Sequence, residues 1–162
     1  MTIAVGDRIP SAHVLQMGSN GPESIDVADH IAGKKVVIFA LPGAYTSTCT
    51  NAHMPSFIRT FDAFREKGID EIICVSVNDV FVSDHWGEST GAKTKGITMF
   101  ADWNSAFGQA IGLTFDAPAV GYIQRIVRSA MVINDGVVEV LQIEESRGEC
   151  IMTAGETLLE MV

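Results

Sequence analysis

The chain of 162 residues is 47% apolar and 19% charged, which is typical of one compact domain over residues 1–162 and excludes a disordered segment or a coiled coil. Eleven Lys and Arg against 20 Asp and Glu give a net charge of −9, which argues against nucleic acid or an anionic membrane as the main partner. No apolar run approaches the roughly 20 residues of a membrane-spanning helix, and the first residues lack the pattern of a signal peptide.

The first predicted strand covers residues 35–41, an apolar run rich in β-branched side chains and without polar alternation. Such a run is typical of a strand that is covered on both faces. It ends at a Pro-Gly pair, and a helix is predicted next, because Phe57, Phe61 and Phe64 recur at helical spacing. We expect these three rings to belong to the core and the helix to end near Gly68.

Further elements are predicted from apolar runs and from the residues that flank them. These are a buried strand at 71–77, a short helix at 80–90 capped by Asn78-Asp79, a strand at 97–101, and a helix from Asn104 through Ile111. Residues 112–124 show no clear period and are expected to form a loop.

The strongest hairpin signal is the turn Asn134-Asp135-Gly136 between apolar runs at 125–133 and 137–143. Residues 144–150 are polar, and a short amphipathic helix closes the chain. This order predicts an α/β fold: a central mixed sheet with helices on both faces, the thioredoxin-like architecture. In such sheets functional sites lie beyond the carboxyl ends of the strands, so we expect the functional site in the segment after residue 41.

The three cysteines, Cys49, Cys74 and Cys150, are an odd number in a chain long enough to need no disulfide framework. We therefore expect a reducing compartment, the cytoplasm, where a cysteine is either buried filler or a reactive thiol. Cys49 follows Thr48, a natural N-cap, so we expect it in the first turn of a helix and partly accessible. Unpaired N–H groups and the helix dipole there favour a thiolate over a thiol.

Arg125 and Arg128 lie inside the otherwise apolar run 125–133. A guanidinium in such a strand is costly to bury unless it has an anion or a hydrogen-bond partner. One interpretation is a structural pair between Arg128 and an Asp or Glu. The other is that the partner is a thiolate, with substrate oxygens also in reach.

A thiolate, an arginine and the hydroxyl of Thr46 are the groups needed to attack a peroxide oxygen. The O–O bond breaks, one oxygen stays on sulfur as sulfenic acid, and the other leaves as water or alcohol. Arg128 and nearby N–H groups would stabilise the developing charge, and Thr46 can both donate and accept a hydrogen bond.

The spacing of Pro42, Thr46 and Cys49, PxxxTxxC, resembles the active-site signature of peroxiredoxins. The string PGAYTSTCTNAHMPSF is similar to the type II (5-like) subfamily of the thioredoxin-like superfamily, and the resemblance covers essentially the whole chain. It implies that Cys49 is the peroxidatic cysteine, that Thr46 binds peroxide and that Arg128 activates the thiolate. By the same resemblance Pro42 shields the pocket.

The resemblance also suggests pocket-supporting roles for Gly43, Thr48 and His53, and no cofactor. The family commonly forms homodimers through loops near the active site, so Phe81 and Trp86 are candidates to face a partner subunit.

Regeneration of the enzyme requires a thiol that reduces the sulfenic acid. Cys74 lies in the middle of a predicted strand and is expected to be buried, yet plant members resolve with a cysteine at the matching position. Cys150 follows a polar stretch and resembles the resolving cysteine of animal members. Many bacterial relatives instead use glutathione or glutaredoxin, which we favour; thioredoxin with Cys150 or Cys74 as resolver is the alternative.

Other functions are distinguished by what surrounds Cys49. His53 follows it by four residues, but no second ligand pair at metal spacing appears, so no metal is expected and His53 is expected to pack near the pocket. A thioredoxin-type exchanger needs a C-x-x-C pair, whereas the residues at that spacing are Thr46 and Ala52. A cysteine hydrolase would need a His–Asn/Asp relay close to Cys49. A non-catalytic binding module on the same fold would not consume peroxide.

Overall fold

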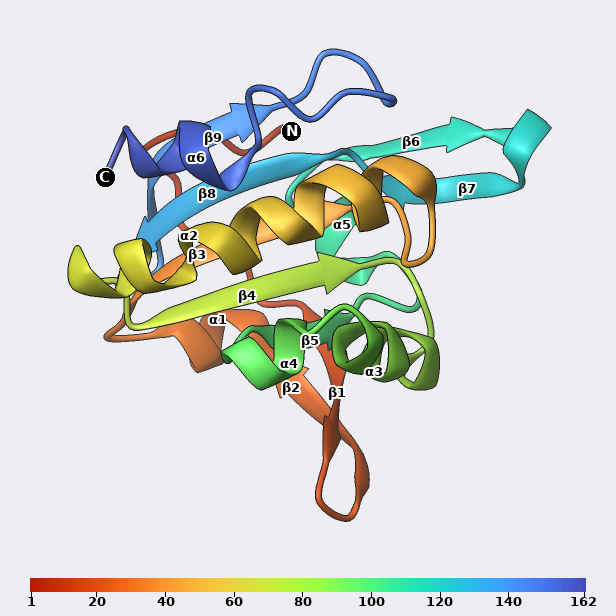
Figure 1. The fold of residues 1–162 in the computed structure, drawn as a ribbon. Helices are drawn as coiled ribbons and strands as arrows, with labels where there is room; N and C mark the ends of the chain where they lie inside the picture. Colours follow the sequence, from red (N-terminus) through yellow and green to blue (C-terminus); the bar gives the residue numbers. More distant parts are fainter.

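The computed structural model describes residues 1–162 and has a mixed seven-stranded sheet with helices on both faces (Figure 1). The spatial order is β2-β1-β5-β4-β3-β8-β9, and β6 and β7 form a separate two-stranded ribbon. The strands are β1 (His13–Gly18), β2 (Gly21–Asp26), β3 (Lys35–Leu41), β4 (Glu71–Ser76), β5 (Thr98–Ala101), β6 (Thr114–Ala117), β7 (Tyr122–Ile126), β8 (Ser129–Asn134) and β9 (Val137–Ile143). The helices are α1 (Val27–Ile31), the π-helical turn η1 (Cys49–His53), α2 (Met54–Glu66), α3 (Val80–Ser89), α4 (Ala92–Lys95), α5 (Ala106–Ala110), the 3₁₀ turn η2 (Pro118–Val120) and α6 (Gly155–Leu159).

Strand β3 lies in the middle of the sheet, parallel to β4 and antiparallel to β8. Its alternate side chains enter two separate cores. Val36 and Ile38 pack on the face that α1 and α5 cover, whereas Val37 and Phe39 pack on the face that α2, α3 and α6 cover. This confirms the prediction of a strand buried on both faces, and it fixes the end of β3 as the rigid base of the segment that follows.

The helix predicted from the phenylalanine spacing is confirmed as α2. Phe57 and Phe64 are fully buried, and Phe61 is only partly buried against the same core. Helix α3 is also confirmed, with the Asp79 carboxylate accepting from Val82 N at 2.9 Å. In the predicted hairpin turn, Asp135 and Gly136 both have positive φ, which is the type I′ geometry that joins β8 to β9.

Two parts of the prediction are wrong. The expected loop at 112–124 contains the β6–β7 ribbon, whose strands are only partly buried and therefore carry no clear apolar alternation. The expected strand 125–133 is interrupted at Val127 and Arg128, which separate β7 from β8. The β1–β2 hairpin is not predicted, because β2 exposes half of its residues and includes Pro22 and Glu23.

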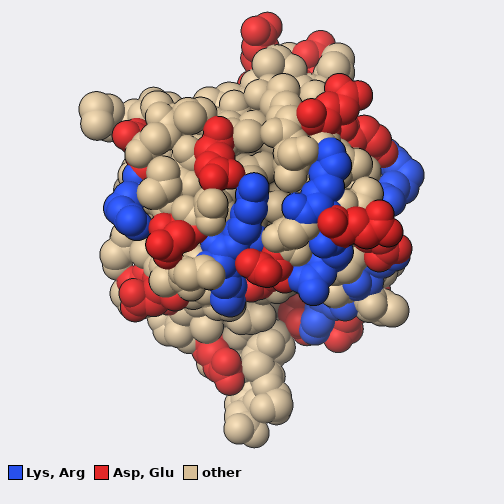
Figure 2. Space-filling view, turned by 90° about the vertical axis from the view of Figure 1, so that its left-hand side faces the viewer, with Lys and Arg blue, Asp and Glu red and all other residues tan.

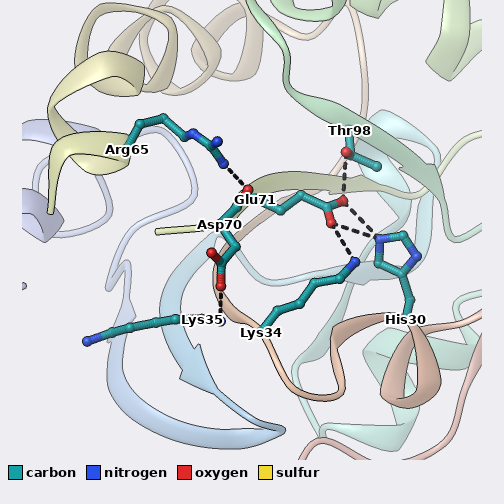
Figure 3. Close-up of polar contacts among 7 residues, drawn as sticks. All are labelled: His30, Lys34, Lys35, Arg65, Asp70, Glu71 and Thr98. Atoms are coloured by element: carbon teal, nitrogen blue, oxygen red, sulfur yellow. Dashed lines mark hydrogen bonds and ion pairs between the residues drawn. The ribbon is translucent and has the colours of Figure 1, made fainter. Parts of the chain in front are cut away.

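Charged side chains gather at the end of the sheet where β3 and β4 begin, and basic and acidic groups are interleaved on this face (Figure 2). The Glu71 carboxylate accepts from His30 Nε2 at 2.9 and 3.0 Å, from Thr98 Oγ1 at 2.8 Å and from Lys34 Nζ at 3.3 Å (Figure 3). Burial raises the pKa of Glu71, but these hydrogen bonds together outweigh burial and lower it. None of the helices has both the length and the apolar character that a bilayer crossing requires.

Candidate active site

Cys49 lies just beyond the carboxyl end of β3, where the chain turns into a helix. The helical backbone begins at Ser47, so Cys49 is in its first turn, and the N–H groups of Thr48 and Cys49 have no acceptor within the protein. The positive end of the helix dipole therefore lies beside the sulfur, as predicted.

The first helical turn widens into the π-helix η1, which Met54 closes by donating from its N–H to Cys49 O. Pro55 follows at the start of α2. Because a proline ring clashes with the carbonyl of the residue four positions before it, the chain cannot continue as an undistorted α-helix. Helix α2 therefore starts anew around Pro55, and His53 lies fully buried on the inner side of the turn.

Arg128 reaches Cys49 from the break between β7 and β8. Its Nη2 donates to Cys49 Sγ at 3.1 Å, and its side chain is almost fully buried. No Asp or Glu forms an ion pair with it, so the structural carboxylate pair considered from sequence is absent. The guanidinium is thus placed against a sulfur that accepts a hydrogen bond best as a thiolate.

His53 holds the other side of that guanidinium. Its Nδ1 lies 3.0 Å from Arg128 Nη1, and its Nε2 lies 3.1 Å from Thr153 O. A carbonyl oxygen can only accept, so Nε2 carries the proton and Nδ1 offers a lone pair to Arg128. Burial and the neighbouring Arg128 hold the pKa of His53 well below its usual 6.5, so the ring is neutral at pH 7. His53 therefore supports the pocket by orienting Arg128, and no group of three or more His, Cys, Asp or Glu is placed to hold a metal ion.

The carbonyl that His53 contacts is fixed by Glu144. The Glu144 carboxylate accepts from Ile151 N at 3.2 Å, from Met152 N at 3.2 Å, and from Thr153 N and Oγ1 at 3.1 and 2.8 Å. Burial raises the pKa of Glu144, but these hydrogen bonds outweigh it and lower the pKa. A chain of contacts therefore runs from Glu144 through Thr153 and His53 to Arg128 and Cys49.

The loop before the helix is braced by Arg125. Its Nη1 donates to Pro42 O at 2.9 Å and to Val77 O at 3.1 Å, and a Cβ at Gly43 would lie only 2.7 Å from the same atom. A side chain at position 43 would therefore displace the Arg125 guanidinium from these carbonyls. Thr46 Oγ1 donates to Gly43 O at 2.8 Å, which leaves its lone pairs free to accept.

Two expectations for this segment are wrong. Thr48 has helical backbone angles and does not cap the helix; its hydroxyl donates to Gly148 O at 3.2 Å and joins the helix start to the segment after β9. Cys49 is not partly accessible, because 0% of its surface is exposed. Arg128 and the residues around it enclose the sulfur. The sequence rules of apolar alternation and helix capping do not predict this enclosure.

A cleft of about 340 Å³ lies directly outside this enclosed sulfur. It brings together Pro42, Thr46, Thr48 and Arg128, four of the residues predicted from sequence. The other lining residues come from the start of the helix, from the β6–β7 ribbon with its η2 turn, and from the segment after β9. They are Ser47, Phe115, Val120, Tyr122, Ser146, Arg147 and Gly148. The remaining predicted residues, Gly43, Cys49 and His53, lie behind this lining.

Sequence reasoning missed four residues that build the site. Arg125 was noticed as a charge in an apolar run, a signal that could have identified it. Asn78 was interpreted as a helix cap, but its Oδ1 accepts from Ala44 N at 2.8 Å and holds the loop after β3. Glu144 and Thr153 gave no signal, because their burial arises only from tertiary packing.

The other two cysteines have different surroundings. Cys74 is fully buried in β4, opposite Phe39 of β3, and burial together with the charge of Cys49 raises its pKa well above 9.0. Cys150 is partly buried beside Thr153, and burial raises its pKa above 9.0. All three cysteines are free.

The two side chains expected to face a partner subunit differ. Phe81 is 65% exposed, as such a role needs. Trp86 is fully buried, and its Nε1 donates to Thr50 Oγ1 at 3.1 Å, so the expectation for Trp86 is wrong. The two residues lie on different faces of α3, and Trp86 is on the face that packs against the core. The sequence of this short helix is only weakly amphipathic, so it does not indicate which face is buried.

Comparisons with known proteins agree with this geometry. The family profile described as Redoxin matches residues 4–156. Peroxiredoxin-2E-2, chloroplastic, of Oryza sativa subsp. japonica is 39% identical over 161 residues, which cover 97% of this chain and 72% of that protein. Peroxiredoxin-2B of Arabidopsis thaliana is 36% identical over 159 residues, covering 98% of this chain and 97% of that protein.

The crystal structure of reduced Prx3 from Vibrio vulnificus in complex with H₂O₂ has a TM-score of 0.93 at 40% identity, and the match covers 99% of both chains. Peroxiredoxin 5 from Alvinella pompejana has a TM-score of 0.84 at 30% identity, covering 98% of this chain and 96% of that one. The fold and the site define a thioredoxin-like protein with a cysteine at a helix start. The chain belongs to the peroxiredoxin family, and it is therefore a thiol-dependent peroxidase.

Proposed function

We propose that this peroxiredoxin reduces hydrogen peroxide and alkyl hydroperoxides through a sulfenic acid on Cys49. The observation that carries the proposal is the 3.1 Å contact between Arg128 Nη2 and Cys49 Sγ at the start of a helix. A guanidinium and a helix N-terminus both favour negative charge, and the thiolate is the form of a cysteine that acts as a nucleophile.

In the proposed reaction the Cys49 thiolate attacks one peroxide oxygen. An S–O bond forms, the O–O bond breaks, and the other oxygen leaves with a proton from solvent as water or alcohol. Sulfur loses two electrons and the peroxide gains them. Arg128 and the unpaired N–H groups of Thr48 and Cys49 would stabilise the charge that develops along this axis.

Thr46 and Pro42 would determine how a peroxide is oriented in the pocket. Because the Thr46 hydroxyl already donates to Gly43 O, it would accept the O–H of the incoming peroxide rather than donate to it. Pro42 lines the cleft outside the sulfur and contributes no donor of its own. Since Cys49 is fully buried, the reaction also needs a small local opening, which a molecule as small as hydrogen peroxide uses most easily.

The sulfenic acid is proposed to be reduced by glutathione, alone or through glutaredoxin. The full burial of Cys74 within the sheet favours an outside thiol. Cys150 supports the alternative, a thioredoxin-dependent enzyme with an internal disulfide, because it follows an exposed polar segment at 145–149.

Stopped-flow mixing with hydrogen peroxide tests the first step. The unmodified chain and Cys74→Ser should consume one equivalent rapidly, and Cys49→Ser should not. Slow decay that is the same in all three proteins would instead support a non-catalytic binding module. Mass spectrometry of the oxidised protein tests the second step: a glutathione adduct on Cys49 supports an outside reductant, and a Cys49–Cys150 or Cys49–Cys74 link identifies a resolver.

A cytoplasmic homodimer completes the proposal. Three free cysteines suit a reducing compartment. The exposed rings of Tyr45, 52% exposed, and Phe81 lie on the neighbouring 42–46 loop and α3, which the contact of Tyr45 with His85 joins. Sedimentation of the unmodified chain and of Phe81→Glu tests the dimer; a monomer in both proteins would refute it.

A further inference from the structure

The cleft outside Cys49 carries positive charge in a protein whose net charge is −9. Its lining contains Arg128 and Arg147 and no acidic side chain. Arg128 is used by Cys49 and His53, as described above. Hydrogen peroxide is neutral and too small to extend from the sulfur to the rim of the cleft, so the proposed peroxidase step does not account for Arg147.

Arg147 is the one arginine of the chain's six whose guanidinium makes no hydrogen bond or ion pair within the protein. The side chain is exposed, and its guanidinium carbon lies 5.7 Å from the centroid of the Phe115 ring. This cation–π contact holds the group at the wall of the cleft. All five of its N–H donors remain available, in the fork geometry that matches a carboxylate.

The acidic groups nearby define the side from which an anion can approach. Asp116, Glu144 and Glu145 line a second hollow that adjoins the cleft and shares Arg128 and Arg147 with it. They would repel an anion there. The cleft itself has no acidic side chain in its lining, and the hydroxyls of Thr46, Ser47 and Thr48 lie in it, so an anionic group in the cleft meets no like charge.

We propose that Arg147 is a specificity-determining residue, which binds the carboxylate of a small organic molecule that reacts at Cys49. This inference rests on the proposed function. Two kinds of reactant bring a carboxylate to this site: a thiol reductant such as glutathione, and a hydroperoxide of a fatty acid. A cleft of about 340 Å³ is within the usual size range of small-molecule sites, so it can hold a tripeptide or part of an acyl chain.

For glutathione, the carboxylate on Arg147 would place the thiol beside the oxidised sulfur. The glutathione sulfur attacks the Cys49 sulfenic acid, an S–S bond forms, and the S–O bond breaks with release of water. A second glutathione then attacks the mixed disulfide, which returns the Cys49 thiolate and yields glutathione disulfide. The two glutathiones supply the two electrons that the peroxide removed.

The experiment measures the rate constant for a carboxylate-bearing reactant divided by that for an uncharged one. This ratio is compared in the unmodified chain, in Arg147→Gln and in Arg8→Gln. Arg8 is the matched control, because it is exposed, contacts Asp135 at the far end of the sheet and removes the same charge. One arm oxidises the protein with one equivalent of hydrogen peroxide and compares reduction by glutathione with reduction by uncharged 2-mercaptoethanol. The other compares oxidation by linoleic acid hydroperoxide with oxidation by uncharged cumene hydroperoxide.

Arg147→Gln should lower at least one of these ratios about tenfold, the factor that one charge-assisted hydrogen bond contributes, whereas Arg8→Gln should change neither. A fall in the thiol ratio identifies the reductant as the carboxylate source, and a fall in the peroxide ratio identifies the hydroperoxide. Raised salt should reduce the same ratio in the unmodified chain. Unchanged ratios in Arg147→Gln overturn the inference, whereas failure of the unmodified chain to react with hydrogen peroxide overturns the proposed function.

Discussion

His53 and Arg128 face each other as a neutral acceptor and a cationic donor, with Nδ1 and Nη1 3.0 Å apart inside the protein. The arrangement requires a neutral ring, which burial and the guanidinium itself maintain. The second Nη of Arg128 is thereby directed at Cys49 Sγ. One guanidinium thus joins the proposed nucleophile to the Thr153 carbonyl through His53.

Arg128→Ala should remove the cation beside the Cys49 sulfur and slow the reaction with hydrogen peroxide. The variant loses a charge-assisted hydrogen bond to sulfur, so we expect the rate constant to fall about 10- to 100-fold. Stopped-flow mixing with hydrogen peroxide measures this rate constant. Arg128→Lys keeps the charge but loses the paired contacts with Cys49 and His53, and it should recover only part of the rate. An unchanged rate constant in Arg128→Ala would assign activation to the helix N-terminus alone.

The stability of the protein should fall as the pH is lowered through 6.5, because of His53. Its folded-state pKa lies well below the 6.5 of the unfolded chain, so the unfolded state binds the proton more readily in this range. The free energy of unfolding should therefore decrease by up to about 1.4 kcal/mol per pH unit below pH 6.5. Urea denaturation between pH 7.5 and about 5 measures this slope. His53→Asn should flatten the slope, and an equal slope in both proteins would mean that another group causes it.

Gly43→Ala and Arg125→Ala should damage the same contact. The added Cβ would lie 2.7 Å from Arg125 Nη1 and displace the group that holds Pro42 O and Val77 O. Each single variant should slow the peroxide reaction about tenfold through a misplaced loop. Because the Cβ has no guanidinium to displace in the double variant, that protein should be no slower than Arg125→Ala. Additive losses in this double-mutant cycle would show that Gly43 has a different role.

The sequence was most informative where chemistry and local pattern coincide. Strand β3 and helix α2 are apolar at the spacing of their own secondary structure, and the PxxxTxxC spacing is local, so these features could be predicted. The burial of Cys49 could not, because it depends on tertiary contacts such as that of Arg128, which lies 79 residues away in the chain. Glu144 shows the same limit: three of its four donors are backbone N–H groups, which every sequence contains.

Glu71→Gln should destabilise the fold at neutral pH without altering the site, which lies at the opposite end of β3. The carboxylate accepts from His30, Lys34 and Thr98, and its pKa in the folded protein is below its ordinary value of 4.5. Its contribution is therefore fully present above pH 4.5 and is lost as the pH falls through the folded-state pKa. We expect Glu71→Gln to lower the free energy of unfolding by about 1–3 kcal/mol at pH 7, because an amide replaces a partly buried, charged acceptor.

The two proteins should approach equal stability as the pH falls through the folded-state pKa of Glu71, since protonation then removes the charge that the substitution removes. Chemical denaturation at pH 7 and at a series of pH values below 4.5 makes this comparison. Lys35→Gln is the matched control, because Lys35 pairs with Glu139 on the same face but makes no contact with the Glu71 carboxylate. A stability difference that persists unchanged at low pH would mean that Glu71 acts through packing rather than through its charge.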